Sequence, residues 1–167
     1  MPTARARAHG GAVVWLGWAL AAACGDPESL PCEEPAGVAP ELDRVALMVG
    51  EVSVSAEVAQ GEEARSSAWA GRQCDLDALL WVPEAVGPAA VELCAVVVAV
   101  DLAFVHQGEV VAVEPERPPC ERPCEACPVY GDDGPAVDAV LWLPAGQVDV
   151  GVGDSVTGLE VVDLPTG

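Results

Sequence analysis

The chain has 167 residues, 51% of them hydrophobic and 20% charged, which suits one globular domain with short accessory segments and excludes two large domains. Its 27 acidic residues face only 7 basic ones, all arginine, and the formal net charge is −20. Binding to nucleic acid, or to an anionic membrane through a basic patch, needs clustered cations, so the composition argues against both roles.

The N-terminus has the pattern of an export signal. Arg5 and Arg7 precede an apolar run over residues 12–23, which is too short to span a bilayer as a helix. The run ends in three alanines followed by Cys24, similar to the lipobox of bacterial lipoproteins. We therefore expect a signal peptide over 1–23, a lipidated Cys24 that anchors the chain to a membrane, and a location in the cell envelope. An ordinary secretory signal cut at the same bond is the alternative.

A proline-rich segment follows the leader. Residues 24–40 contain four prolines, and proline at this density favours extended, semi-rigid chain. This composition predicts a tether that ends at a single domain over residues 41–164.

Within that domain, most apolar residues repeat with a period of two. Alternation over 45–49 and 52–58, and short apolar β-branched runs over 79–82, 91–105, 110–113, 137–143 and 156–164, predict strands. We read 91–105 as two strands or one bent strand, 106–109 as a hairpin turn, and 156–164 as one or two strands split at Gly158. Residues 61–72 begin with acids and end with arginine, which predicts one short helix. The expected fold is all-β, a compact barrel or sandwich of about seven to nine short strands.

Several pieces of the sequence, in order, resemble domain-of-unknown-function family 192 (DUF192). They begin with Glu62-Glu63-Ala64-Arg65 and continue through Val100-Asp101-Leu102-Ala103-Phe104, Pro144-Ala145-Gly146 and Val152-Gly153-Asp154. The resemblance implies a compact β-domain and brings no established activity. The family's run F-W-M-K-N-T-x-I-P-L-D aligns with residues 91–101, where of the polar residues only Asp101 is kept. We therefore expect a divergent member that keeps the fold.

Cysteines are the most reactive residues of the expected domain. With Cys24 set aside, six remain, an even number that predicts disulfides in an oxidising compartment. Fifteen connectivities are open. We expect Cys120 to pair with Cys127 or Cys124, as related proteins often carry two cysteines there. Cys74 and Cys94 flank the central strands and could bridge them, with Cys94 as a small buried thiol the alternative. A zinc site from the three loop thiolates with His106 or Cys94 is the alternative. The candidates are Cys32, Cys74, Cys94, Cys120, Cys124 and Cys127.

The sequence shows no convincing catalytic group. Asp101 is a candidate ligand-site residue inside an apolar run, or else a strand-end residue that accepts backbone N–H bonds, and Tyr130 is a second candidate. Three tryptophans at 69, 81 and 142 are expected in the core. We expect a non-enzymatic binding or structural module on an envelope lipoprotein, with no cofactor and no bound metal, and no particular protein or small-molecule partner indicated. A metal-binding or thiol-redox protein using the Cys120/Cys124/Cys127 loop, and a hydrolase using Asp101, are the alternatives.

Overall fold

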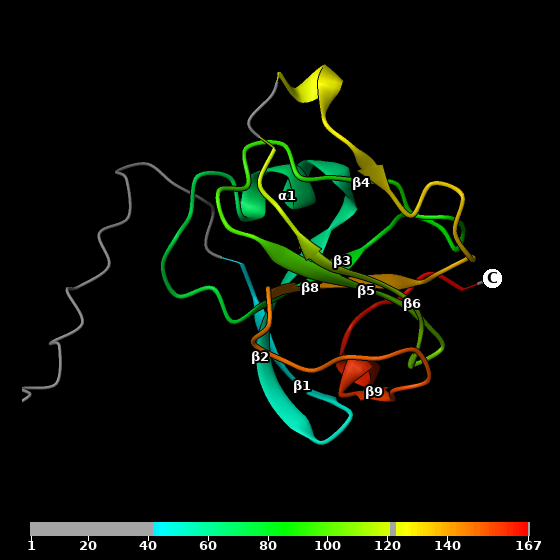
Figure 1. The fold of residues 1–167 in the computed structure, drawn as a ribbon. Coiled ribbons are helices and arrows are strands. Elements are labelled where there is room, and N and C mark those ends of the chain that lie inside the picture. Colours follow the sequence, from blue (N-terminus) through cyan, green and yellow to red (C-terminus); the bar gives the residue numbers. More distant parts are fainter. Residues whose placement is uncertain (1–41, 121–122, 167) are drawn as a thin grey trace, which may run out of the picture. The chain divides into compact units, whose positions relative to one another are not determined.

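The computed structural model describes residues 42–120 and 123–166, and all of them belong to one compact unit. The expected signal peptide, Cys24 and the tether through residue 40, including Cys32, lie outside these ranges. Within them the chain forms nine strands, one α-helix and two short 3-10 helices (Figure 1), so the all-β expectation is confirmed. The described residues contain no helix long and apolar enough to cross a bilayer.

The elements follow in chain order. They are β1 (Arg44–Val49), β2 (Val52–Gln60), α1 (Gly61–Ala68), β3 (Ala78–Val82), β4 (Val91–Glu92), β5 (Val100–His106), β6 (Glu109–Arg117), η1 (Cys124–Ala126), β7 (Val129–Tyr130), β8 (Ala139–Pro144), β9 (Val156–Thr157) and η2 (Leu159–Val161).

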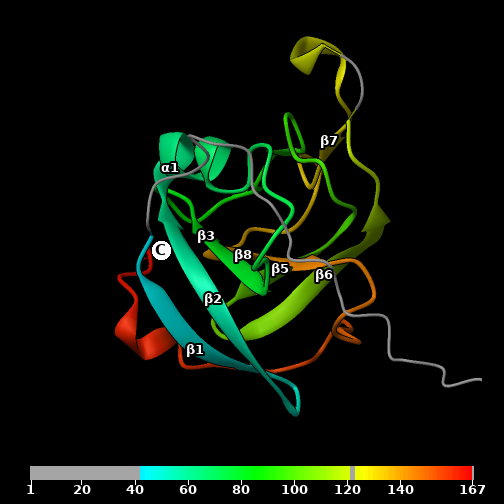
Figure 2. The same ribbon diagram turned by 90° about the vertical axis from the view of Figure 1, so that its left-hand side faces the viewer.

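Seven strands form one curled sheet in the order β6-β5-β8-β3-β2-β1-β9, while β4 and β7 pair separately. Only β2 and β3 are parallel, and α1 makes the crossover between them. The curl brings the two ends of the sheet together, as the two views show (Figure 2). Val110 donates to the Asp154 carbonyl at 2.9 Å and accepts from Gly153 at 2.8 Å, and Glu109 bridges Ser155. These bonds close the sheet along a seam.

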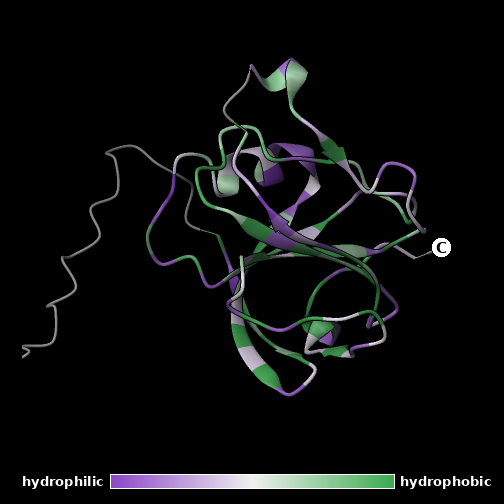
Figure 3. Ribbon diagram, viewed as in Figure 1, coloured by the Kyte–Doolittle hydropathy of each residue, from purple (hydrophilic) through white to green (hydrophobic). Residues whose placement is uncertain are grey.

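Alternating side chains give the sheet two apolar faces. Leu80, Ala103 and Leu141 point into the space that the curled sheet encloses, while Leu79 and Phe104, one residue along their strands, pack on the other face. The outer face is covered by α1 and by the segments around β4 and β7. Figure 3 shows the same alternation as hydrophobic and paler bands along the β1–β2 hairpin. Because β3, β5 and β8 are buried on both faces, their sequences read as nearly continuous apolar runs.

The predicted hairpin between β5 and β6 is present. Its two central residues, Gln107 and Gly108, both have positive φ, at 51° and 77°, as a type I′ turn requires. The Asp138 carboxylate accepts the Gln107 backbone N–H at 2.7 Å and so holds the turn against the start of β8.

One segment differs from the sequence-based expectation, and two others follow one of the alternatives left open there. The helix ends at Ala68 rather than residue 72, because Gly71 turns the chain with a φ of 69° and donates its N–H to the Ala95 carbonyl. The run 91–105 forms two strands, β4 and β5, separated by a seven-residue turn region. After β9, Gly158 has a φ of 91°, and the remainder forms η2 instead of a second strand.

Candidate functional site

Asp101 lies on β5 at the end of the sheet and is 5% exposed. One carboxylate oxygen accepts the Glu116 backbone N–H at 2.6 Å, and the other accepts the Gly146 N–H at 2.8 Å. Glu116 sits at the irregularity where β6 departs from regular pairing with β5, with a φ of 53°. The carboxylate therefore links this irregularity to the turn after β8. This is the predicted alternative role, a strand-end residue that accepts backbone N–H bonds.

The turn at residues 144–147 contributes lining residues to two separate hollows of the surface. One, of about 310 Å³, lies between this turn and β6 and includes Asp101, Glu116 and Gly146. The other, of about 620 Å³, lies on the opposite side of the turn and includes Pro144 and Gln147. The structure thus brings together the Asp101 and Pro144-Ala145-Gly146 pieces, which lie more than forty residues apart in sequence. We call the larger hollow the turn groove.

The turn groove is lined mostly by polar side chains from separate parts of the chain. Arg44 comes from β1, Gln73, Asp75 and Asp77 from the segment before β3, and Gln147 from the turn after β8. One Asp77 oxygen accepts the Ser55 backbone N–H at 2.7 Å, which fixes that side chain at the groove wall. None of these five side chains belongs to a sequence motif, so none was predicted as a site residue.

A buried ion-pair cluster lies next to the turn groove. Glu57 on β2 is 6% exposed and accepts from Arg44 at 2.6 Å and from Arg72 at 2.6 and 3.1 Å. Arg72 also donates to the Ala68 carbonyl at the end of α1. The cluster fixes the Arg44 guanidinium from behind, while 46% of that side chain remains exposed toward solvent.

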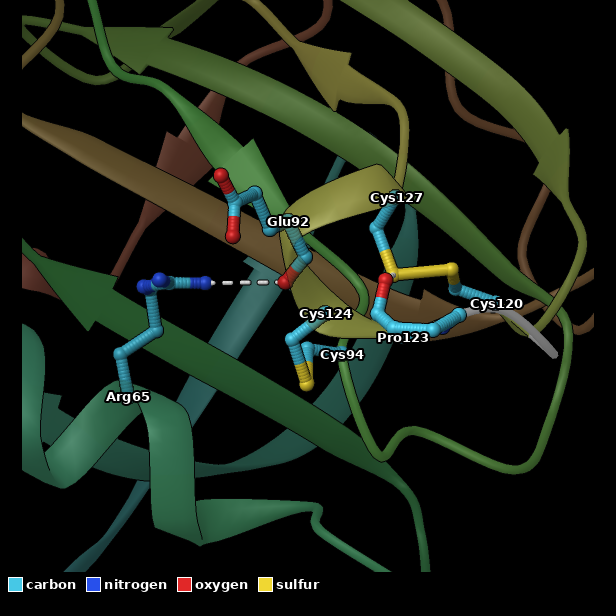
Figure 4. The surroundings of a disulfide bond; sticks show 7 residues. All are labelled: Arg65, Glu92, Cys94, Cys120, Pro123, Cys124 and Cys127. Atoms are coloured by element: carbon cyan, nitrogen blue, oxygen red, sulfur yellow. Dashed lines mark hydrogen bonds between the residues drawn. A yellow bond between two sulfur atoms is a disulfide. The ribbon is translucent and has the colours of Figure 1, made fainter.

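A second arginine is built into the outer apolar face. Arg65 of α1 is 7% exposed, pairs with Glu62, and donates to the Glu92 carbonyl at 3.1 Å (Figure 4). Its guanidinium lies 5.1 Å from the centre of the Trp81 ring and 5.9 Å from that of Trp142. Trp69, Trp81 and Trp142 are at most 6% exposed, which places all three in the core as expected.

Tyr130 does not share a hollow with Asp101. It lies on β7 and lines a different hollow of about 300 Å³, with the Arg117 guanidinium 5.3 Å from its ring centre. Phe104 lines that hollow and packs on the outer face of the sheet, under α1, β4 and β7. The valines around Asp101 pack against the core that the curled sheet encloses. The two candidate ligand-site residues are therefore on opposite faces of the sheet, and a ligand role for either stays a prediction.

The described cysteines are joined in disulfides. Cys120 pairs with Cys127 (Cα–Cα 5.8 Å), one of the two pairings expected for it. Cys94 pairs with Cys124 (Cα–Cα 5.2 Å), so the candidate Cys74–Cys94 bridge is wrong, and Cys74 is disulfide-bonded in another way. The physical reason is that β4 pairs with β7, which brings Cys94, the second residue after β4, to the loop that carries η1 (Figure 4).

These pairings bear on the zinc alternative. Zinc binds cysteine as a thiolate, and the sulfurs of Cys120, Cys124 and Cys127 are all in disulfides. Among residues 42–120 and 123–166, no three His, Cys, Asp or Glu side chains are grouped closely enough to hold a metal ion.

Comparison with known proteins identifies the family. Residues 45–158 match the model of DUF192, described as an uncharacterised ACR. The chain belongs to this family. No curated protein matches it.

Two solved structures share the DUF192 chain's fold. A putative transcription regulator from Sinorhizobium meliloti 1021 has a TM-score of 0.58 and 22% identity, over 72% of this chain and 96% of that one. A protein of unknown function from Novosphingobium aromaticivorans DSM 12444 has a TM-score of 0.55 and 18% identity, over 71% and 89%. At these identities the likeness establishes the fold alone.

The structure explains part of how this DUF192 member departs from the family run. Cys94 stands where that run has lysine, and it is covalently tied to Cys124. Ala95 stands where the run has asparagine and has a φ of 61°. Asparagine adopts this left-handed conformation more readily than other non-glycine residues, so the residue of the family run suits this backbone turn better than alanine does.

Proposed function

We propose that this DUF192 protein is an envelope-anchored lipoprotein whose β-domain is a non-enzymatic binding module, with the turn groove as its binding surface. The observation that supports the envelope location is the set of disulfides, which follow a predicted export leader, since disulfides persist in oxidising compartments outside the cytosol. The tether would hold the domain away from the membrane, and a multiply acylated Cys24 would supply durable attachment.

Binding is favoured over catalysis by the way the polar residues are used. Both oxygens of Asp101 are occupied by backbone N–H groups, and the buried Glu57 is occupied by two arginines. Both carboxylates thus take part in bonds that hold separate segments of the fold together. The turn groove, in contrast, brings polar groups from separate segments of the chain together in one hollow, and such convergent polar groups orient ligands in binding sites.

A regulator acting on DNA is a poorer proposal for this chain. The structural neighbour from Sinorhizobium meliloti is named a putative transcription regulator, but a chain of net charge −20 would be repelled by the phosphate backbone of DNA.

The proposal has a consequence for cysteine pairing. Five described cysteines are disulfide-bonded, four of them with each other, and Cys24 and Cys32 complete the seven of the chain. A Cys24 whose sulfur carries a lipid cannot form a disulfide. The proposal therefore requires Cys32 to be the partner of Cys74, and three disulfides in the mature protein.

Intact mass of the protein recovered from its native membrane fraction tests the proposal. The expected mass is that of residues 24–167 plus acyl groups, less six hydrogens for three disulfides. Cys24→Ser should abolish acylation and release the chain from membranes, while Cys74→Ser, as control, should leave acylation unchanged. Recovery of a full-length chain with Met1 and reduced thiols from the cytosol would contradict the proposal.

A further inference from the structure

The turn groove has the size of a small-molecule site. Its volume of about 620 Å³ falls within the usual range of roughly 300 to 1,000 Å³. Four separate segments line it, so its shape depends on the folded domain and not on one flexible loop. Its lining combines polar side chains with three apolar residues, Leu76, Val98 and Pro144.

The charges lining the turn groove disfavour an anion. Arg44 contributes one positive charge, and Asp75 and Asp77 contribute two negative ones, so the lining carries a formal charge of −1. The Arg44 guanidinium is already shared with Glu57 at 2.6 Å, which weakens its attraction for a free phosphate or carboxylate. The wider chain, at −20, adds to this repulsion.

The hydrogen-bonding capacity of the lining selects among uncharged ligands. A guanidinium only donates, a carboxylate only accepts, and the Gln147 amide does both. A ligand that satisfies such a mixture must offer donors and acceptors side by side. Hydroxyl groups on adjacent carbons do this, since each donates one hydrogen bond and accepts two. The apolar residues of the lining fit the C–H surface of a sugar ring.

From this arrangement we propose that the turn groove binds an uncharged saccharide segment. The proposal deepens the binding function proposed above and rests on it. Gln147 makes the sharpest test because it is exposed, follows β8 in a surface turn and lies outside the apolar core. Asp75 offers a second test: its φ is 52°, a conformation that asparagine also tolerates, so Asp75→Asn removes the charge without straining the backbone.

Calorimetric titration of the full mature protein is the experiment, in micelles of a detergent without a sugar headgroup. The probes are two uncharged saccharides, N-acetylchitotriose and maltotriose, with glycylglycine as a zwitterion and inorganic phosphate as an anion. We expect saturable binding of at least one saccharide and none of the other two probes. Gln147→Ala should weaken that binding roughly tenfold, the loss of about one good hydrogen bond, and Asp75→Asn should weaken it too.

Gln60→Ala is the matched control, because Gln60 is an exposed glutamine that lines a different hollow. It should leave binding unchanged. Absence of saturable binding by both saccharides, binding of glycylglycine or phosphate in their place, or equal loss in Gln60→Ala and Gln147→Ala would overturn the saccharide proposal. Intact mass of the same preparation reports acylation separately, so failure of the envelope proposal is distinguishable.

Discussion

At the scale of single residues, the protein uses its few cations inside the fold. Arg65 and Arg72 are buried and bonded, one over tryptophan rings and the other to Glu57. Burying a charge is costly unless it is paired. Removing one partner of such a contact leaves the other charge buried without compensation, which lowers the free energy of unfolding strongly. The polar residues of the family-like motifs, such as Arg65 and Asp101, thus mainly hold segments of the fold together.

We expect Glu57→Ala to be strongly destabilising, by about 3–5 kcal/mol, because it removes the buried carboxylate to which both Arg44 and Arg72 are bonded. Urea unfolding monitored by tryptophan fluorescence measures this. Glu114→Ala is the control, since the Glu114–Arg117 pair is about one third exposed on both sides, and such a pair contributes less than about 1 kcal/mol. Equal losses in the two variants would contradict the assigned role of the buried cluster.

Ala95 is held in the left-handed conformation at a φ of 61°, which costs a residue with a β-carbon about 1–2 kcal/mol. We expect Ala95→Asn to recover about 0.5–1 kcal/mol, because asparagine adopts this conformation more readily. Ala85→Asn serves as control, since Ala85 is exposed and has no positive φ. A shift in urea midpoint in Ala85→Asn as large as in Ala95→Asn would show that relief of backbone strain is not the cause.

At the scale of elements, two disulfides constrain the loop around η1. The Cys94–Cys124 bond spans 30 residues and the Cys120–Cys127 bond spans 7. The first connects the segment after β4 to η1, which stands out from the domain in Figure 1, and the second closes the loop upon itself. A fixed, protruding loop follows from these links.

The chain-entropy relation predicts different losses when each bond is removed. Replacing both Cys94 and Cys124 by alanine should cost about 3.5 kcal/mol, and the same change at Cys120 and Cys127 about 2.5 kcal/mol, because the longer loop restricts the unfolded chain more. Urea midpoints of the two double variants, compared at equal m-values, measure the difference. The reverse order would indicate that contacts of the loop, and not chain entropy, decide its stability.

The positions of strands along the chain were easier to predict from sequence than the pairing of strands and cysteines in space. The strands at 45–49, 52–58 and 79–82 follow from apolar alternation or from a short apolar run, which reports burial directly. The pairing of Cys94 with Cys124 does not, because it depends on β4 meeting β7 across nearly forty residues. The turn groove escaped prediction for the same reason: Arg44, Asp75 and Gln147 meet only when the sheet curls.

At the scale of the whole molecule, the dominant feature is charge of one sign. A net charge of −20 on 167 residues keeps the protein soluble but destabilises the compact state through self-repulsion. Added salt screens charges more than about 10 Å apart at 0.1 M and leaves the buried Glu57 cluster nearly untouched.

Raising sodium chloride from 0.01 M to 0.5 M should therefore raise the melting temperature, by on the order of a few degrees, because repulsion among surface carboxylates falls. Scanning calorimetry at neutral pH measures the shift. Glu57→Ala, if it retains a cooperative transition, should show the same increment, since its lost pair is shielded from salt. A melting temperature that falls with salt would indicate that exposed ion pairs outweigh the repulsion.

The seam between Gly153–Val156 and Gly108–Val110 makes the last strand indispensable although it has only two residues. A chain truncated before Gly153 would lose β9 and with it the bonds that close the sheet. The edges of β1 and β6 would then present unpaired N–H and C=O groups to solvent, and such edges recruit further strands from neighbouring molecules. Proteolytic clipping in this short stretch would thus promote aggregation.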